Sequence, residues 1–141
     1  MADEPADLLE RLVIGAVAVT ERAIAAAGAD LTFVQWRVLL IVGEHAEGAT
    51  VSEIAARIGA QPSPASRLIG RLKQRGVVQT AREDPDRRVT RVRLTAGGHD
   101  LRRRVLDHRR ADIEQVVGSM ALTATEAGVV ARLVRSFEPF A

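Results

Sequence analysis

Between Ala49 and Thr95 the sequence specifies two short helices and a hairpin in immediate succession. Thr50 and Glu53 form a capping box, in which a hydroxyl and a carboxylate satisfy free amides of the first helical turn. Gly59 ends the first helix and Gly76 the second, because glycine adopts the left-handed conformation of a helix end at little cost. Both helices have apolar residues at helical spacing on one face: Val51, Ile54, Ala55 and Ile58 in the first, and Ala65, Leu68, Ile69 and Leu72 in the second.

The second of these helices has polar residues opposite its apolar face. Ser63–Pro64 offers a capping hydroxyl followed by a proline already at helical φ, and Gln61–Pro62 is an alternative start two residues earlier. A helix that lies in the major groove of DNA needs an apolar back against its own domain and hydrogen-bonding side chains in front. The residues predicted to contact DNA from this helix are Ser63, Pro64, Ser66, Arg67, Arg71 and Gln74.

A β-hairpin follows the two helices. Val77–Arg82 leads into the turn at residues 83–87, and Arg88–Leu94 returns. Arginines at a hairpin tip suit a minor groove, although alone they are equally typical of a solvated turn. Behind a two-helix unit with this polar face, DNA binding is favoured. The sequence therefore predicts a winged helix-turn-helix whose wing contacts DNA through Asp86, Arg87 and Arg88.

The formal net charge of +2 conceals a strong division along the chain. Residues 1–56 hold three basic against nine acidic side chains, net −6. Residues 57–110 hold fifteen against five, net +10, and residues 111–141 hold two against four, net −2. The basic block coincides with the second helix, the wing and the start of the next helix, which favours a polyanionic partner.

Helices at both ends of the chain carry more apolar surface than one core needs. Residues 3–27 form a predicted helix whose apolar residues cover roughly half of its circumference, more than the stripe of somewhat over 100° expected of a helix on one core. A last helix begins at the Thr123–Glu126 capping box. We expect these helices to form a dimer interface; deep burial within one subunit is the alternative. The predicted dimerisation residues are Leu8, Leu12, Val17, Val130, Leu133 and Phe137.

Two further helices complete the expected fold. One begins at a capping box of Thr32 and Gln35, is almost entirely apolar, and ends before Gly48. Thr95 caps the other, which runs to about Ser119 and carries Arg102 and Arg109, seven residues apart, on the stripe that later becomes apolar.

Trp36 and Arg37, in the apolar helix, offer an aromatic wall and one cation. They are candidates for a crevice that binds an aromatic acid. The favoured alternative is that Trp36 packs in the core and Arg37 forms an ion pair.

Catalysis, metal binding and cofactor binding are not expected. The chain has no cysteine, so disulfides and thiol-based sensing are excluded. His45, His99 and His108 lie in different segments without metal-ligand spacing and are expected at the surface. No phosphate-binding loop or nucleophile–base arrangement is visible. Without a signal peptide or a run long enough to span a membrane, a cytoplasmic, nucleoid-associated protein is expected.

Several motifs together resemble one family. The most specific is Asp86-x-Arg88 in the wing followed by Leu94-Thr95-x-x-Gly98. With the segments Leu31–Leu39, Thr50–Ala55, Pro62–Leu72 and Arg75–Val78, it makes nearly the whole chain similar to the MarR family of bacterial transcription regulators. Gln61 and Pro64 depart from the family pattern, which usually has a small hydroxyl residue at the first position and threonine or a similar residue at the second.

The resemblance implies a dimer with a helical dimerisation region and two winged lobes, whose affinity for an operator is often lowered by a small ligand. We therefore expect one domain that is mainly α with a small β wing (α+β). Residues 1–48 and 96–141 are the predicted dimerisation region, and residues 49–95 the DNA-binding lobe.

The favoured function is a dimeric repressor that binds double-stranded DNA at an inverted repeat and responds to a small effector. The alternatives are a weakly specific architectural DNA-binding protein and a winged-helix module that binds other proteins. The operator, the regulated genes, the effector and the direction of regulation are not encoded in a recognisable form.

Overall fold

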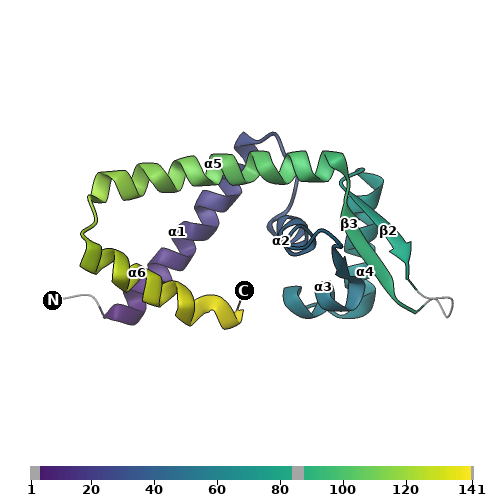
Figure 1. The fold of residues 1–141 in the computed structure, drawn as a ribbon, viewed down its shortest axis with the longest axis horizontal. Coiled ribbons are helices and arrows are strands. Elements are labelled where there is room, and N and C mark those ends of the chain that lie inside the picture. The colour runs from purple at the N-terminus through teal and green to yellow at the C-terminus, as the bar shows by residue number, and fades with distance from the viewer. Residues whose placement is uncertain (1–3, 84–87, 141) are drawn as a thin grey trace. The chain divides into compact units, whose positions relative to one another are not determined.

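The computed structural model describes residues 4–83 and 88–140, and it separates into two compact units, Met1–Arg109 and Arg110–Ala141. The fold is mainly helical with a small antiparallel sheet, as predicted (Figure 1). The elements in chain order are α1 (Pro5–Ala26), α2 (Phe33–Val42), β1 (Ala49–Thr50), α3 (Val51–Ile58), α4 (Pro62–Gln74), β2 (Val78–Arg82), β3 (Thr90–Leu94), α5 (Ala96–Met120), α6 (Ala124–Phe137) and a 3₁₀ turn (Glu138–Phe140).

Three helices begin at the capping boxes that the sequence predicted. At α2, the Gln35 amide donates to the Thr32 hydroxyl at 3.2 Å and the Thr32 amide donates to the Gln35 side chain at 2.9 Å. The same reciprocal pair forms at α3 between Thr50 and Glu53, and at α6 between Thr123 and Glu126. A capping residue stabilises its helix by about 1 kcal/mol, so these local patterns fix where the helices begin.

The sheet has the order β1-β3-β2, and the strand β1 was not predicted. Ala49 and Thr50 pair with Val92 and Arg91 of β3, which makes the returning strand of the hairpin the central one. Gly48, with φ of +79°, lies just before β1. Only glycine fits there, because a Cβ would lie 1.9 Å from the carbonyl oxygen of Val92. β1 therefore joins the wing to the start of α3.

One apolar core lies at the centre of the first unit. Trp36, Leu39, Ile54 and Leu72 are its largest fully buried side chains, and Val105 of α5 is fully buried with them. They come from α2, α3, α4 and α5, and the C-terminal end of α1 adds Ala23 and Ile24. Helix α2 is thus packed within the same core as the winged lobe.

A short set of hydrogen bonds joins the end of α4, the hairpin and the start of α5. Gly76, with φ of +72°, ends α4, and the Val77 amide donates back to Leu72 at 3.2 Å. The Thr95 hydroxyl donates to the Gly76 carbonyl at 2.6 Å and accepts from the Gly98 amide at 3.0 Å. Thr95 therefore caps α5, as predicted, and also anchors it to the helix-turn-helix.

The boundary between the two units falls inside α5, at Arg109 and Arg110. Within the described part of the second unit, the apolar side chains are largely exposed, with Val130 at 47% and Phe137 at 45%. Leu133 is half-buried. In the first unit, Leu8 and Leu12 on α1 are exposed and Val17 is half-buried. The assignment of these residues to a dimer interface remains a prediction.

Candidate nucleic-acid interface

Helix α4 begins at the earlier of the two predicted starts. Gln61 occupies the N-cap with extended backbone angles and Pro62 is the first helical residue, so Ser63 is not the cap. No side chain caps this helix end. Proline is favourable in the first turn because the amide that it lacks has no partner within the helix. Pro62 and Pro64 both lie in this first turn and have no backbone N–H. Two of the amides that bind a phosphate at many helix N-termini are therefore missing here.

The exposed face of α4 holds every residue predicted for it. Ser63, Pro64, Ser66, Arg67, Arg71 and Gln74 are all exposed, whereas Ala65, Ile69 and Leu72 are buried in the core. Arg67 and Arg71 help to line a hollow of about 330 Å³, together with the apolar residues Val34, Ile58 and Leu68. The arrangement presents two guanidinium groups, two hydroxyls and an amide on one side of a helix that is firmly packed on the other.

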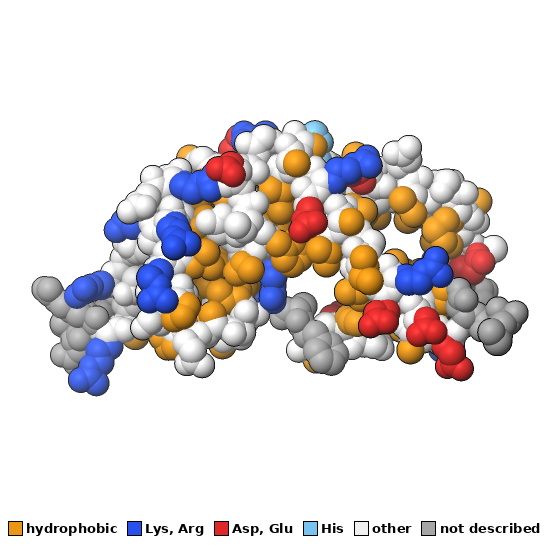
Figure 2. Space-filling model, turned by 180° about the vertical axis from the view of Figure 1, so that it is seen from behind, with side chains coloured by type: hydrophobic (Ala, Val, Ile, Leu, Met, Phe, Trp, Pro, Cys, Tyr) orange, Lys and Arg blue, Asp and Glu red, His pale blue; other side chains and the backbone are white. Residues whose placement is uncertain are grey.

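The wing tip lies partly outside the described residues, and Asp86 and Arg87 are among those not described. Arg88 is described and exposed at the start of the returning chain. On the face shown in Figure 2, Lys and Arg side chains gather over the winged lobe at the left of the picture. The basic block of the sequence thus forms a positively charged surface on the winged lobe.

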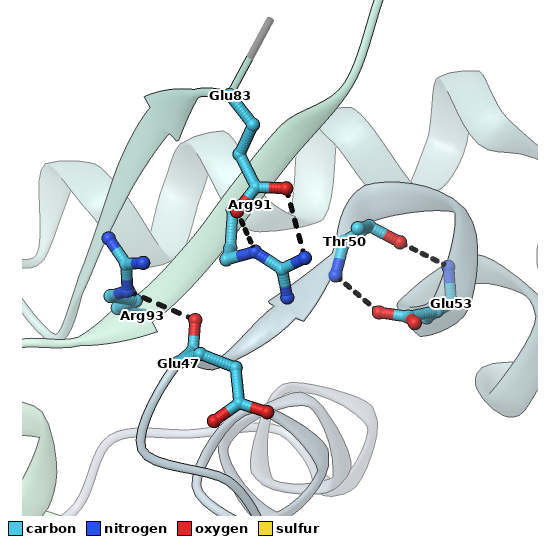
Figure 3. A network of polar contacts seen from close by, with 6 residues as sticks. All are labelled: Glu47, Thr50, Glu53, Glu83, Arg91 and Arg93. Carbon is cyan, nitrogen blue, oxygen red and sulfur yellow. Dashed lines mark hydrogen bonds and ion pairs between the residues drawn. The ribbon is translucent and has the colours of Figure 1, made fainter.

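A network of polar contacts holds the base of the wing (Figure 3). Arg91 forms a two-pronged ion pair with Glu83, with 2.9 Å between Nη2 and Oε2. Nε of Arg93 donates to the carbonyl oxygen of Glu47 at 3.0 Å. The hydrogen bond and positive charge of Arg91 lower the pKa of Glu83, and the pKa of Arg91 is raised in turn. Sequence reasoning did not identify this network, because its partners lie up to 46 residues apart.

Comparison with known proteins agrees with this geometry. A sequence model of the MarR family matches residues 29–89, from the end of α1 to the wing. The transcriptional repressor IacR of Pseudomonas putida is 41% identical over 69 residues, which are 49% of this chain and 41% of that protein. This part of the chain, which holds the helix-turn-helix, matches the MarR family.

Two solved structures extend the similarity beyond the winged lobe. The structure of RV1404 from Mycobacterium tuberculosis has a TM-score of 0.77 and 28% identity, and the match covers 98% of this chain and 95% of that one. CouR from Rhodococcus jostii RHA1, solved with bound p-coumaroyl-CoA, has a TM-score of 0.75 and 24% identity, with 96% and 92% coverage. In the sequence comparisons, by contrast, the chain spans less than half the length of IacR and of the other curated relatives that it matches.

Trp36 packs in the core, as the favoured interpretation of the sequence has it, whereas Arg37 has a different partner from the one expected. Trp36 is 1% exposed and belongs to the core. Nη2 of Arg37 donates to the backbone carbonyl of Arg57 at 2.8 Å. Arg57 in turn forms an ion pair with Glu44, which lowers the pKa of that carboxyl group. Arg37 is therefore held by a carbonyl, where the sequence interpretation expected a carboxylate.

Two arginines that were not predicted as site residues lie against α2. The guanidinium carbon of Arg109 is 5.9 Å from the centre of the Trp36 ring. About two turns earlier on α5, Arg102 approaches Gly43, the C-cap of α2, where a Cβ would be 2.6 Å from its Nε. Nε of Arg102 and Nε1 of Trp36 are buried without a hydrogen-bond partner. The only sequence signal was the spacing of Arg102 and Arg109 along one helical stripe.

The histidines are all exposed, as expected, and no group of three or more potential metal ligands occurs among the described residues. Within residues 4–83 and 88–140, no helix combines the length and the apolar character that crossing a bilayer requires.

Proposed function

We propose that this chain is a sequence-specific, DNA-binding transcription repressor of the MarR family. The observation that carries the proposal is the division of α4 into a buried apolar back and an exposed front with Arg67, Arg71 and Gln74. Such a helix can enter the major groove while Arg88 of the wing reaches the neighbouring minor groove or backbone. The similarity to IacR, which is described as a transcriptional repressor, supports the direction of regulation.

The repressor acts as a homodimer. Support comes from exposed apolar residues on α1, where Leu12 is 61% exposed, and on α6, where Val134 is 58% exposed. At roughly 25 cal/mol per Å², covering several such side chains is worth several kcal/mol. In sedimentation, the chain should be a dimer at micromolar concentration, and Leu12→Asp should dissociate it. Ala18→Asp, about 120° away on the polar side of α1, is the matched control and should stay dimeric.

A two-fold dimer presents two recognition helices in opposite orientations, so the operator is an inverted repeat with half-site centres about 10 base pairs apart. The intergenic DNA beside the chain's own gene is the first place to seek it. Footprinting tests the proposal: protection of such a repeat, and weak binding to isolated half-sites, is expected. Equal affinity for operator and random DNA would favour an architectural role, and no salt-sensitive DNA binding would favour a protein-interaction module.

A small organic acid releases the repressor from its operator. CouR is a protein of this fold that was solved with an aromatic acyl-CoA. In the present chain, Arg102 and Arg109 hold positive charge partly out of water, against Gly43 and Trp36 respectively, and burial followed by the charge of Arg102 lowers the pKa of Arg109. An acidic ligand that contacts these two guanidinium groups would compensate both effects. Arg37, engaged by a backbone carbonyl, is less available than the sequence indicated.

A further inference from the structure

Arg91 is placed at the centre of the small sheet. It pairs by register with Thr50 of β1 on one side and Ala81 of β2 on the other. Its side chain is 19% exposed, although the chain at this point belongs to the basic wing. The position connects the hairpin to the strand that leads directly into α3.

The guanidinium group of Arg91 is already occupied. Its Nε and Nη2 donate to the two oxygens of Glu83, the first residue beyond β2 (Figure 3). The Glu83 amide donates to the carbonyl oxygen of Val89 at 3.1 Å, which closes the hairpin at the same level. The ion pair thus spans the two strands of the wing where the described hairpin ends. A bidentate pair of this kind fixes direction as well as distance.

The surroundings of Arg91 are acidic. Glu83, Glu53 and Glu47 each raise its pKa, with Glu83 first among them. Arg91, Glu47, Glu53 and Arg57 also line a hollow of about 340 Å³. A guanidinium surrounded by carboxylates has little field left for a phosphate, so charge alone does not make Arg91 a DNA contact.

The other edge of the sheet, the strand β1, is attached to the helix-turn-helix. Nε of Arg93 holds the Glu47 carbonyl, and Gly48 permits the close approach of β1 to Val92. Thr50 then caps α3, the helix that precedes the recognition helix α4. Between the hairpin and α3 there is therefore a continuous path of pairing, through β3 and β1, that includes Arg91.

We infer that Arg91 is a positioning residue for DNA binding: its ion pair with Glu83 holds the wing at the angle at which Arg88 meets DNA while α4 occupies the major groove. This inference rests on the proposed function. Arg91 itself does not contact DNA. The inference assigns different tasks to two arginines of the same hairpin, which the basic character of the wing does not distinguish.

Operator affinity measured by fluorescence anisotropy at several salt concentrations tests these tasks. Arg88→Gln should lower the magnitude of the salt slope by about one, because a phosphate contact is lost. Arg91→Gln should weaken binding about fivefold, the upper range for an exposed ion pair, without changing the slope. Arg91→Lys should also weaken binding, because lysine keeps the charge but not the two-pronged geometry.

The decisive variant is Glu83→Gln, which removes a negative charge beside the DNA. If only charge matters, affinity rises; if the ion pair positions the wing, affinity falls. The exchange Glu83→Arg with Arg91→Glu should restore affinity relative to either single change. Asp100→Asn, which neutralises an acid paired with two arginines on α5, is the control and should not weaken binding. Melting curves identify variants that fail to fold.

The outcomes separate the inference from the proposed function. Operator binding by the unchanged chain together with equal or tighter binding by Glu83→Gln would overturn the inference alone. A lower salt slope for Arg91→Gln, equal to that of Arg88→Gln, would show that Arg91 contacts phosphate and would also overturn it. No DNA binding by the unchanged chain would overturn the proposed function, and the inference with it.

Discussion

The guanidinium carbon of Arg109 lies 5.9 Å from the centre of the Trp36 ring, within the range of a cation–π contact. Arg102 and Arg109 are seven residues apart on α5, and they approach Gly43, the C-cap of α2, and Trp36 within α2. The first half of α5 therefore places two guanidinium groups against α2 and its C-cap. Nε1 of Trp36 and Nε of Arg102 are both buried without a hydrogen-bond partner.

This relationship gives a direct test for the acidic effector. Trp36 is the only tryptophan, so the intrinsic fluorescence of the protein reports on its surroundings. Benzoate should change that fluorescence saturably, whereas benzamide, which has the same ring without the charge, should not. Arg109→Gln and Arg102→Gln should each weaken benzoate binding about tenfold or more, the usual effect of losing a hydrogen bond to a charged group. Arg103→Gln, on the exposed side of the same helix, is the control.

The same titration separates the two candidate cations. If Arg37→Gln abolishes benzoate binding and Arg109→Gln does not, the acid binds at the position that the sequence indicated. If benzoate gives no saturable change in the fluorescence of the unchanged protein, the proposal that an organic acid binds beside α2 is wrong.

The recognition helix and the wing should differ in what they contribute to binding. Arg67 projects from the first half of α4, where a guanidinium group reaches guanine O6 and N7. Arg67→Ala should therefore cost about 1–3 kcal/mol on the operator and relax the preference at one base pair per half-site. Arg88→Ala should weaken operator and random DNA more evenly, because the minor groove and backbone carry little sequence information. Affinities on both DNAs for both variants check this, and exchanged effects would mean that the roles are reversed.

The features that the sequence predicted correctly are those determined by neighbouring residues. A capping box needs only a threonine and an acceptor three residues later, and all three predicted boxes are present. The apolar faces of α3 and α4 are buried because 3.6-residue periodicity is itself local. The start of α4 stayed open between two prolines because both Pro62 and Pro64 satisfy the same first-turn rule.

The features that the sequence did not predict depend on residues far apart in the chain. β1 is two residues long, and it is a strand only because Ala49 meets Val92. Nothing around Arg93 indicates that it will hold the carbonyl of Glu47. A tryptophan such as Trp36 is equally suited to line a ligand pocket and to pack in a core, and only its burial in the structure decides between the two. Its contact with Arg109 depends on how α5 packs against α2.

Acid should destabilise the fold in part through the capping boxes. The pKa of Glu53 is below its ordinary value of 4.5, chiefly because its carboxylate accepts the Thr50 amide. A group with a lowered folded-state pKa stabilises the fold above its unfolded value, and that stabilisation is lost as pH falls through the folded value. Glu53→Gln keeps a side chain able to cap, as Gln35 does in α2, but removes the titration. Urea unfolding should show the variant's disadvantage at pH 7 shrinking towards pH 3; an unchanged difference would contradict this cause.

The close approach of β1 to β3 should make Gly48 far less replaceable than other glycines with positive φ. A Cβ at Gly48 would lie 1.9 Å from the Val92 carbonyl oxygen, so Gly48→Ala must displace the backbone that pairs Ala49 with Val92. Gly59 has a similar φ, +68° against +79°, with nothing within 4 Å of a Cβ, and it is the matched control. Gly59→Ala should cost only the left-handed penalty of about 1–2 kcal/mol. Gly48→Ala should cost clearly more in urea unfolding and should weaken operator binding as the wing shifts. Equal costs at the two positions would show that β1 pairing contributes little to the position of the wing.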